Sequence, residues 1–235
     1  MRAILLAAGF GTRLRPLTDT IPKCLVPIAG KPLLQIWLER LSDAAVNSFL
    51  INTHYLYKKV DEFVEHSPLK SKIKMVYEPE LLGTAGTLHT NLDFFDGEDG
   101  MLIHADNFCM ADIPAFIKAH LNRPPQCLLT MMAFHTDAPS KCGIIEVDDN
   151  NVAIGFHEKV PSPPGNMANG AVYILSAELL KQLPQLYAYA TDFSLDVLPY
   201  LLGKIFVYET NEFFLDIGTL LNYNKANSHA TSIFR

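Results

Sequence analysis

The sequence predicts an α/β fold in three layers, with helices on both faces of a mixed, mainly parallel sheet. Two observations support this prediction. From the N-terminus to about residue 133, short apolar runs typical of strands buried in parallel sheets alternate with longer segments of helical apolar spacing. After residue 133 the pattern changes to paired strands. We therefore expect one domain, 1–235, with a core at 1–133 and a C-terminal elaboration at 134–235.

The first part of the chain provides the alternating elements. Its apolar runs predict strands at 2–7, 49–52, 73–77, 101–104 and 127–133. Helical spacing predicts helices at 33–45, about 56–64, about 84–92 and 112–121. Pro32 suits the start of the first helix, and Asp112 is a typical N-cap for the last. This β-α alternation is characteristic of Rossmann-like folds.

The second part of the chain predicts a different arrangement. Strands at 143–147 and 152–157 flank the turn sequence DDNN and predict a hairpin. A strand at 167–175 follows, then two helices, strands at 205–209 and 213–215, and a final helix at about 219–229. We read this part as an elaboration of the same domain.

Composition limits the classes of function. The chain is 49% hydrophobic and 19% charged, which is typical of a globular protein. Its net charge of −6 argues against a nucleic-acid partner. The four cysteines are scattered and form no C-x-x-C pair, so they predict neither a zinc site nor a disulfide framework. No signal peptide or membrane span is visible, and we expect a cytoplasmic protein.

The first predicted strand leads into a glycine-rich stretch, which reads from residue 4 as ILLAAGFGTRLRPLTDTIPKCLVPIAGKPLL. Gly9 and Gly11 allow a ligand to approach the backbone and expose N–H groups to an anion. Arg13 offers a planar fork to phosphate oxygens, and Lys23 offers a point charge. The alternative is a tight turn that needs glycines for steric reasons alone. Leu14 occupies the third glycine position of a dinucleotide fingerprint, which weakens a dehydrogenase hypothesis, and no P-loop pattern is present.

Several further motifs occur in order along the chain. They are EPELLGTAGTL, HADNF, GIIEVDDNNVAIGFHEKV, MANGAVYIL and FLDIGT. Together with the glycine-rich stretch, they closely resemble the sugar-phosphate nucleotidylyltransferases over nearly the whole chain. The resemblance implies an enzyme that joins a nucleoside triphosphate to a sugar 1-phosphate. Ala105 departs from the family pattern, which usually has glycine there.

The resemblance also implies roles for individual residues. Arg13, Lys23, Asp106 and Asp216 would be catalytic. The nucleotide would contact Leu6, Ala8, Gly9, Gly11, Thr12, Glu78, Gly83 and Thr84. The sugar phosphate would contact Asn107, Gly143, Glu158, Lys159 and Asn169. We expect no ion pair between Glu158 and Lys159, because neighbouring strand residues face opposite ways.

Two acidic residues are candidates for a metal site. Asp106 follows the apolar strand MLIHA, and Asp216 follows FFL. If both lie at strand ends, they can converge on one ion, and one or two carboxylates plus phosphate oxygens are what Mg²⁺ prefers. The chemistry agrees, because phosphoryl transfer needs charge neutralisation, and a metal usually provides part of it. The alternative is that each aspartate is a polar loop residue or a helix cap.

The base and the sugar are less closely defined. Glu78 stands where many thymidylyl and uridylyl relatives have glutamine, and a carboxylate suits the two donors of guanine. DFSLDVLPYL resembles short guanylyltransferases for mannose or heptose 1-phosphate. A uridylyltransferase acting on an amino sugar 1-phosphate is an alternative, and a non-catalytic nucleotide-sugar-binding subunit is another. We expect a monomer or homodimer with a single activity.

Overall fold

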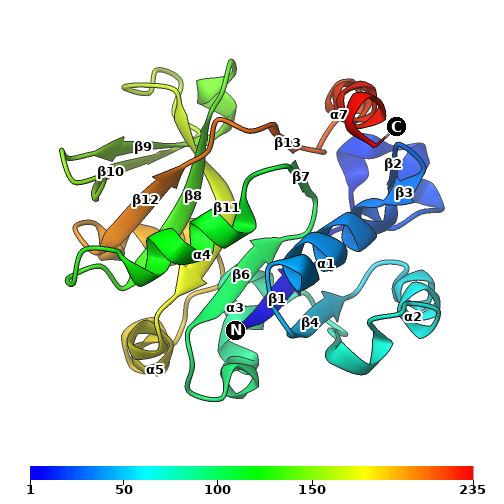
Figure 1. Ribbon diagram of the computed structural model, residues 1–235, viewed down its shortest axis with the longest axis horizontal. Helices are drawn as coiled ribbons and strands as arrows, with labels where there is room; N and C mark the ends of the chain where they lie inside the picture. The colour runs from blue at the N-terminus through cyan, green and yellow to red at the C-terminus, as the bar shows by residue number, and fades with distance from the viewer. Residues whose placement is uncertain (235) are drawn as a thin grey trace. The chain divides into compact units, whose positions relative to one another are not determined.

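The computed structural model describes residues 1–234, which form two compact units (Figure 1). Unit 1 contains Met1–Arg2, Leu82–Ile103 and Ala111–Glu212. Unit 2 contains Ala3–Leu81, His104–Met110 and the chain from Phe213 onward. Each unit contains both strands and helices. Each is also assembled from three segments that are distant in the sequence.

Unit 2 has a layer of neighbouring strands in the order β1, β4, β5. Their bounds are β1 Arg2–Leu6, β4 Ser48–Thr53 and β5 Ile73–Tyr77. β4 and β5 run parallel, with Phe49 opposite Ile73 and Thr53 opposite Tyr77. Two short antiparallel ribbons complete the strands, β2 (Pro27–Ile28) with β3 (Lys31–Pro32) and β7 (Asn107–Cys109) with β13 (Phe214–Asp216).

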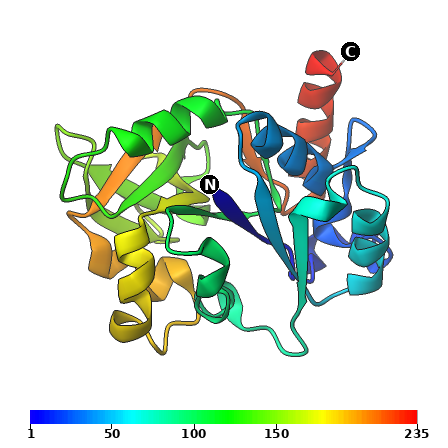
Figure 2. The same cartoon turned by 60° about the horizontal axis from the view of Figure 1, so that its bottom comes forward.

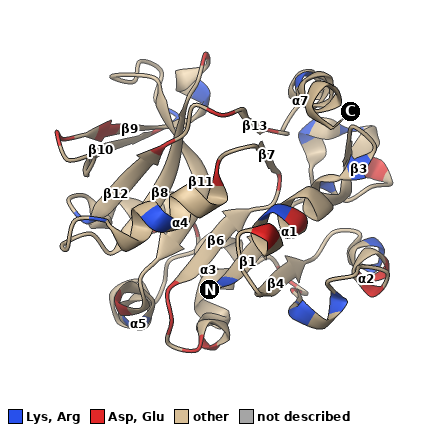
Figure 3. Cartoon of the chain, viewed as in Figure 1, with Lys and Arg blue, Asp and Glu red and all other residues tan. Residues whose placement is uncertain are grey.

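Unit 2 contains three α-helices and four short 3-10 turns among the described residues. Its α-helices are α1 (Leu33–Asp43), α2 (Tyr57–Glu65) and α7 (Leu220–Ile233). α1 follows Pro32 and buries one face that includes Trp37. Acidic and basic residues share the exposed surface of α2 (Figure 3). Four 3-10 turns complete the unit, η1 (Thr12–Leu14), η2 (Leu17–Asp19), η3 (Lys23–Leu25) and η4 (Lys70–Lys72).

Unit 1 is organised around one long strand, β11. β11 pairs antiparallel with β6, β8 and β9; β10 pairs antiparallel with β9, and β12 pairs parallel with β8. The bounds are β6 Gly100–His104, β8 Leu129–His135, β9 Gly143–Val147, β10 Ala153–Glu158, β11 Met167–Leu175 and β12 Ile205–Glu209. The register of β11 against β8 shifts between Asn169 and Tyr173, where Ala171 has a positive φ of 52°.

Helices flank these strands. They are α3 (Gly83–Thr90), α4 (Ile113–Leu121), α5 (Ala177–Leu186) and α6 (Phe193–Asp196), with 3-10 turns η5 (Leu92–Phe95), η6 (Pro139–Lys141) and η7 (Leu198–Leu201). α4 and α5 lie on opposite sides of the strands (Figure 2). The predicted cap of α4 is confirmed, because Asp112 Oδ1 accepts a hydrogen bond from Ala115 N at 2.9 Å.

A buried histidine links the elements of unit 1. The His120 side chain on α4 contacts Thr130 Oγ1 through Nδ1 at 2.7 Å and Asp99 Oδ2 through Nε2 at 3.1 Å. Asp99 Oδ1 also accepts from Ala177 N, at the start of α5, at 2.8 Å. Burial lowers the pKa of His120, while the hydrogen bond to His120 lowers the pKa of Asp99. The network therefore suits a neutral imidazole donating to an ionised carboxylate.

The α/β fold with a mixed sheet and flanking helices confirms the sequence prediction. Strand β7 was not predicted; it directly follows Asp106 and pairs with β13. The organisation as a single domain of 1–235 stays a prediction. Among the helices of residues 1–234, none has the length and apolar character needed to cross a lipid bilayer.

Candidate active site

The glycine loop of unit 2 follows β1. Ala7 N donates to Asn52 Oδ1 on β4 at 2.8 Å, which fixes the backbone where the loop begins. Gly11 has a φ of 63°, and a Cβ there would lie 2.9 Å from Thr18 Cγ2, so packing requires this glycine. A Cβ at Gly9 would meet no atom within 4 Å. The steric alternative therefore explains Gly11 and does not explain Gly9.

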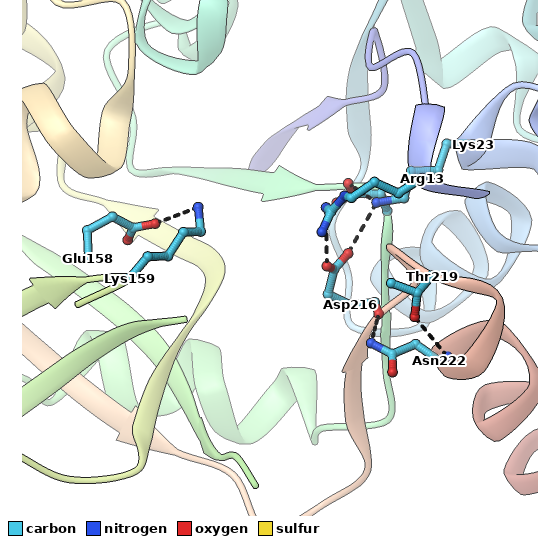
Figure 4. Close-up of polar contacts among 8 residues, drawn as sticks. Arg13, Lys23, Glu158, Lys159, Asp216, Thr219 and Asn222 are labelled. Atoms are coloured by element: carbon cyan, nitrogen blue, oxygen red, sulfur yellow. Dashed lines mark hydrogen bonds and ion pairs between the residues drawn. The ribbon is translucent and has the colours of Figure 1, made fainter. Parts of the chain in front are cut away.

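Lys23 is the centre of the charged cluster in unit 2. Its Nζ lies 2.6 Å from Asp106 Oδ2. The same Nζ lies 3.1 Å from Asp216 Oδ1 (Figure 4). The Lys23 side chain is 9% exposed. Burial alone would lower the pKa of Lys23, but the two carboxylates outweigh burial and raise it. Burial would raise the pKa of Asp106, and the Lys23 ammonium outweighs that effect and lowers it.

Asp216 is positioned by the chain on both sides of it. It ends β13, opposite Asn107 on β7, and its carbonyl accepts from Asn222 Nδ2 at 2.9 Å. Thr219 Oγ1 caps α7 by accepting from Asn222 N at 3.2 Å (Figure 4). A Cβ at Gly218 would lie 2.5 Å from Asp216 Oδ2, so this glycine leaves room for the carboxylate.

Arg13 reaches the same carboxylate from the glycine loop. Its Nη2 lies 3.8 Å from Asp216 Oδ2, and its side chain is 70% exposed. A pair this exposed contributes little to stability. The guanidinium is therefore available to an incoming anion, in contrast to the buried Lys23 ammonium.

Asp106 is held through its backbone. Its carbonyl accepts from Ile217 N at 3.1 Å, and the preceding Ala105 N donates to Leu6 O at 3.1 Å. Ala105 is fully buried, so the packing of unit 2 accommodates its methyl group where the family usually has glycine. These bonds place Asp106 and Asp216 on neighbouring segments, as the sequence predicted.

The two carboxylates fit a divalent cation. Both contact one cationic atom, Lys23 Nζ, so they already converge on a position that accepts positive charge. Within residues 1–234, no group of three or more His, Cys, Asp or Glu side chains is arranged to hold a metal ion. Two carboxylates match Mg²⁺, which takes its other ligands from water and substrate phosphates.

Glu78, which we expected to read the base, is buried in unit 2. It is 3% exposed, and its Oε1 accepts from Asn52 Nδ2 at 2.9 Å. Its carbonyl contacts His54 Nδ1 at 2.7 Å. Asn52 thus bridges Glu78 and the start of the glycine loop. Of the other predicted nucleotide contacts in unit 2, Leu6 and Ala8 flank that bridge, and Thr12 is exposed at the start of η1.

Gly83 and Thr84 begin α3 in unit 1. Gly83 has a φ of 77°, and a Cβ there would lie 2.3 Å from Thr191 O, so no side chain fits. Thr84 Oγ1 accepts from Phe193 N at 2.7 Å. The Thr84 hydroxyl keeps its own proton for another acceptor.

The remaining predicted sugar-phosphate residues of unit 1 lie on its strands. A Cβ at Gly143 would come within 2.4 Å of Glu158 Oε2, so the glycine makes room for this carboxylate. Asn169 Nδ2 donates to the Tyr173 hydroxyl at 2.7 Å, and Asn169 Oδ1 accepts from Ala171 N at 2.8 Å. Asn169 is therefore oriented by two bonds and retains a second amide proton.

Two expectations about these residues need comment. The prediction of no ion pair between Glu158 and Lys159 is wrong, since Lys159 Nζ lies 2.7 Å from Glu158 Oε1 (Figure 4). Lys159 has a φ of 51°, so strand alternation ends at Glu158 and both side chains can turn to one side. Asn107, also expected near the sugar phosphate, is buried on β7 in unit 2, and its carbonyl accepts from Trp37 Nε1 at 2.8 Å.

Sequence reasoning missed four residues that position this machinery. Thr18 Oγ1 donates to Gly11 O at 2.7 Å and stabilises the loop. Asn52, Gly218 and Asn222 act as described above. Gly218 lies inside the motif FLDIGT and was within reach of sequence reasoning, whereas Asn52 and Asn222 act through contacts that no local pattern reveals.

The chain is similar in sequence and in fold to known proteins. The nucleotidyl transferase family matches residues 2–233, and the chain belongs to that family. The D-glycero-alpha-D-manno-heptose 1-phosphate guanylyltransferase of Campylobacter jejuni is 29% identical over 95% of this chain and 97% of its own. The catalytic subunit beta of the Dictyostelium discoideum mannose-1-phosphate guanylyltransferase is 30% identical over 93% of this chain.

The lengths of these relatives differ. The chain spans 61% of the Dictyostelium protein and 62% of a similar Sulfolobus acidocaldarius protein. Among solved structures, HddC from Yersinia pseudotuberculosis complexed with GMP-PN has a TM-score of 0.80 and 28% identity, over 97% of this chain and 99% of its own.

Proposed function

We propose that the protein transfers a nucleoside monophosphate from a nucleoside triphosphate to a sugar 1-phosphate and releases pyrophosphate. The observation that carries the proposal is the convergence of Lys23 and Arg13 on the carboxylates of Asp106 and Asp216. A non-catalytic binding subunit has no need of this complete set. Family membership supports the same reaction class.

The reaction needs positioning and charge neutralisation rather than a nucleophilic side chain. A phosphate oxygen of the sugar 1-phosphate attacks the α-phosphorus, the bond to the bridging oxygen breaks, and pyrophosphate leaves with its electron pair. The attacking oxygen is already anionic, so no general base is required. Arg13 binds phosphate oxygens through its fork, and Lys23 stabilises charge that develops on the reacting phosphates.

Asp106 and Asp216 would hold a divalent cation, proposed to be Mg²⁺. When bound, such an ion neutralises phosphate charge and helps to align the reacting groups. The exposed loop at Gly9 leaves space for a triphosphate to approach the backbone N–H groups. Thr84 and Asn169 supply hydrogen-bonding groups in unit 1 for the nucleotide and the sugar phosphate.

We propose GTP as the nucleotide and mannose or heptose 1-phosphate as the acceptor. The names of the Campylobacter and Dictyostelium relatives and the GMP-PN complex of HddC support this choice. The buried position of Glu78 supports it less directly than the sequence suggested. We further propose that the enzyme acts in the cytoplasm as a monomer or homodimer.

A substrate panel tests the proposal. Four nucleoside triphosphates are each paired with mannose, glucose, N-acetylglucosamine and heptose 1-phosphates, and pyrophosphate release is measured. We expect release only when both substrates are present, and fastest release with GTP. A preference of more than tenfold for UTP would replace the guanylyl assignment with a uridylyl one. Binding of GTP without release in any pairing would indicate a non-catalytic subunit.

A further inference from the structure

The turn formed by Thr191–Asp196 in unit 1 has no role in the proposed reaction. Its sequence, TDFSLD, is nevertheless packed directly against the start of α3. Thr191 O accepts from Ala85 N at 3.0 Å, and Phe193 N donates to Thr84 Oγ1 at 2.7 Å. With Gly83 too close to Thr191 O to carry a side chain, the turn fixes the backbone and the hydroxyl orientation at the start of α3.

The same turn also contacts the strand that carries Asn169. The Phe193 and Tyr173 rings pack with their centroids 5.0 Å apart. The Tyr173 hydroxyl accepts a hydrogen bond from Asn169 Nδ2 at 2.7 Å. Tyr173 is fully buried, and burial raises its pKa, so it remains a neutral phenol between the Phe193 ring and the Asn169 amide.

One carboxylate holds the turn in shape. Asp196 Oδ2 accepts from Thr191 N and Asp192 N, each at 2.8 Å, and from Thr191 Oγ1 at 3.3 Å. The backbone hydrogen bonds lower the pKa of Asp196, so it is ionised at neutral pH. Loss of this carboxylate would release the Thr191 carbonyl that holds α3.

We propose that the turn Thr191–Asp196 is a positioning element for both substrates, setting Thr84 for the nucleotide and, through the packing of Phe193 on Tyr173, Asn169 for the sugar phosphate. This inference rests on the proposed function, because it takes Thr84 and Asn169 as substrate-binding residues. The turn carries none of the residues proposed to act on the reacting phosphates, which are Arg13, Lys23, Asp106 and Asp216, so we expect it to act on substrate binding. Its loss should therefore raise KM more than it lowers kcat.

Substitutions at two positions separate the two branches of the turn. Asp196→Ala should raise the KM for GTP about tenfold and leave kcat within threefold. Asp196→Asn keeps an acceptor oxygen, so it should recover most of the lost affinity. Phe193→Leu removes the ring that packs on Tyr173 and leaves the Phe193 backbone N–H in place, so it should raise the KM for mannose 1-phosphate about fivefold.

The controls distinguish positioning from general damage. Ser228→Ala removes an exposed hydroxyl that donates to Asn224 O within α7. This control should leave the KM for GTP and the KM for mannose 1-phosphate unchanged. Thermal unfolding of each variant shows whether it is folded. Both KM values within twofold of wild type, or a fall in kcat alone, would overturn the proposal.

A second measurement keeps the inference separate from the proposed function. GTP binding to wild type, Asp196→Ala and Asp196→Asn is measured by calorimetry without any sugar phosphate. Weaker binding to Asp196→Ala, with recovery in Asp196→Asn, supports the turn whether or not turnover is seen. A wild type that releases no pyrophosphate with any substrate pair defeats the proposed function, and unchanged GTP binding defeats the inference.

Discussion

Lys23 occupies the position between the carboxylates of Asp106 and Asp216 where a divalent cation would bind. A cation that binds both carboxylates must therefore displace the Lys23 ammonium. Replacing Lys23 with methionine keeps an unbranched buried side chain that is one atom shorter and removes the competing charge. We expect Lys23→Met to bind a divalent cation more tightly than wild type, while its turnover falls by about a hundredfold because the charge on the reacting phosphates is lost.

The size of the affinity change follows from the contacts. A hydrogen bond to a charged group contributes about 1.5–3 kcal/mol, and Lys23 makes two of them, at 2.6 and 3.1 Å. The carboxylate side chains are 35% and 46% exposed, so solvent screening reduces the total to the lower end of that range. About 1.4 kcal/mol corresponds to tenfold in Kd. We therefore expect Mn²⁺ to bind Lys23→Met roughly tenfold more tightly.

Electron paramagnetic resonance measures this directly, because the signal of free Mn²⁺ falls as the ion binds. The titration is made without substrates, so it does not depend on activity. Lys31→Met is the matched control, since Lys31 forms an ion pair with Glu39 away from these carboxylates. An unchanged or weaker Mn²⁺ affinity in folded Lys23→Met would refute the idea that Lys23 and the metal share one position.

Three further predictions concern other parts of the structure. Glu78→Gln keeps an acceptor for the Asn52 amide, so the free energy of unfolding should be unchanged. Initial rates with GTP and UTP then test whether Glu78 reads the base: a reduced preference for GTP supports that role, and an unchanged preference removes it. Gly9→Ala should weaken GTP binding by calorimetry without lowering the unfolding temperature, whereas Gly11→Ala should cost about 1–2 kcal/mol in urea unfolding. Because burial lowers the pKa of His120 in the folded protein, its neutral form contributes stability above the unfolded pKa of about 6.5, and this contribution is lost as pH falls; the urea midpoint should drop from pH 7.5 to pH 5, and less steeply in His120→Gln.

Local chemistry explains why some elements could be predicted from the sequence. Asp112 caps α4 as expected, because an N-cap and the apolar periodicity after it are both local signals. Asp106 and Asp216 lie close enough to contact one atom, which agrees with the expectation that carboxylates after two apolar strands converge, but the ammonium of Lys23 between them was not predicted. A strand at 213–215 was expected close to β13, but its partner β7 was not, since the residues after Asp106 gave no separate strand signal.

Other features depend on contacts between distant residues. The buried position of Glu78 arises from Asn52, which lies on the neighbouring strand. The hydrogen bond from Phe193 N to Thr84 Oγ1 joins residues that are 109 positions apart. The Glu158–Lys159 ion pair depends on one positive φ at Lys159, which strand alternation could not indicate. Sequence patterns indicate which residues belong to the candidate site, and these tertiary contacts determine where each side chain lies and which groups it contacts.

Pyrophosphate release by wild type and Asp216→Asn, with GTP, mannose 1-phosphate and saturating Mg²⁺, tests the central claim most directly. The substitution keeps the shape of Asp216 but removes its charge from the cluster with Lys23 and Asp106. We predict release by wild type that requires both substrates, and a kcat about a hundredfold lower in Asp216→Asn. Near-normal turnover in Asp216→Asn would contradict the assignment of this cluster as the active site.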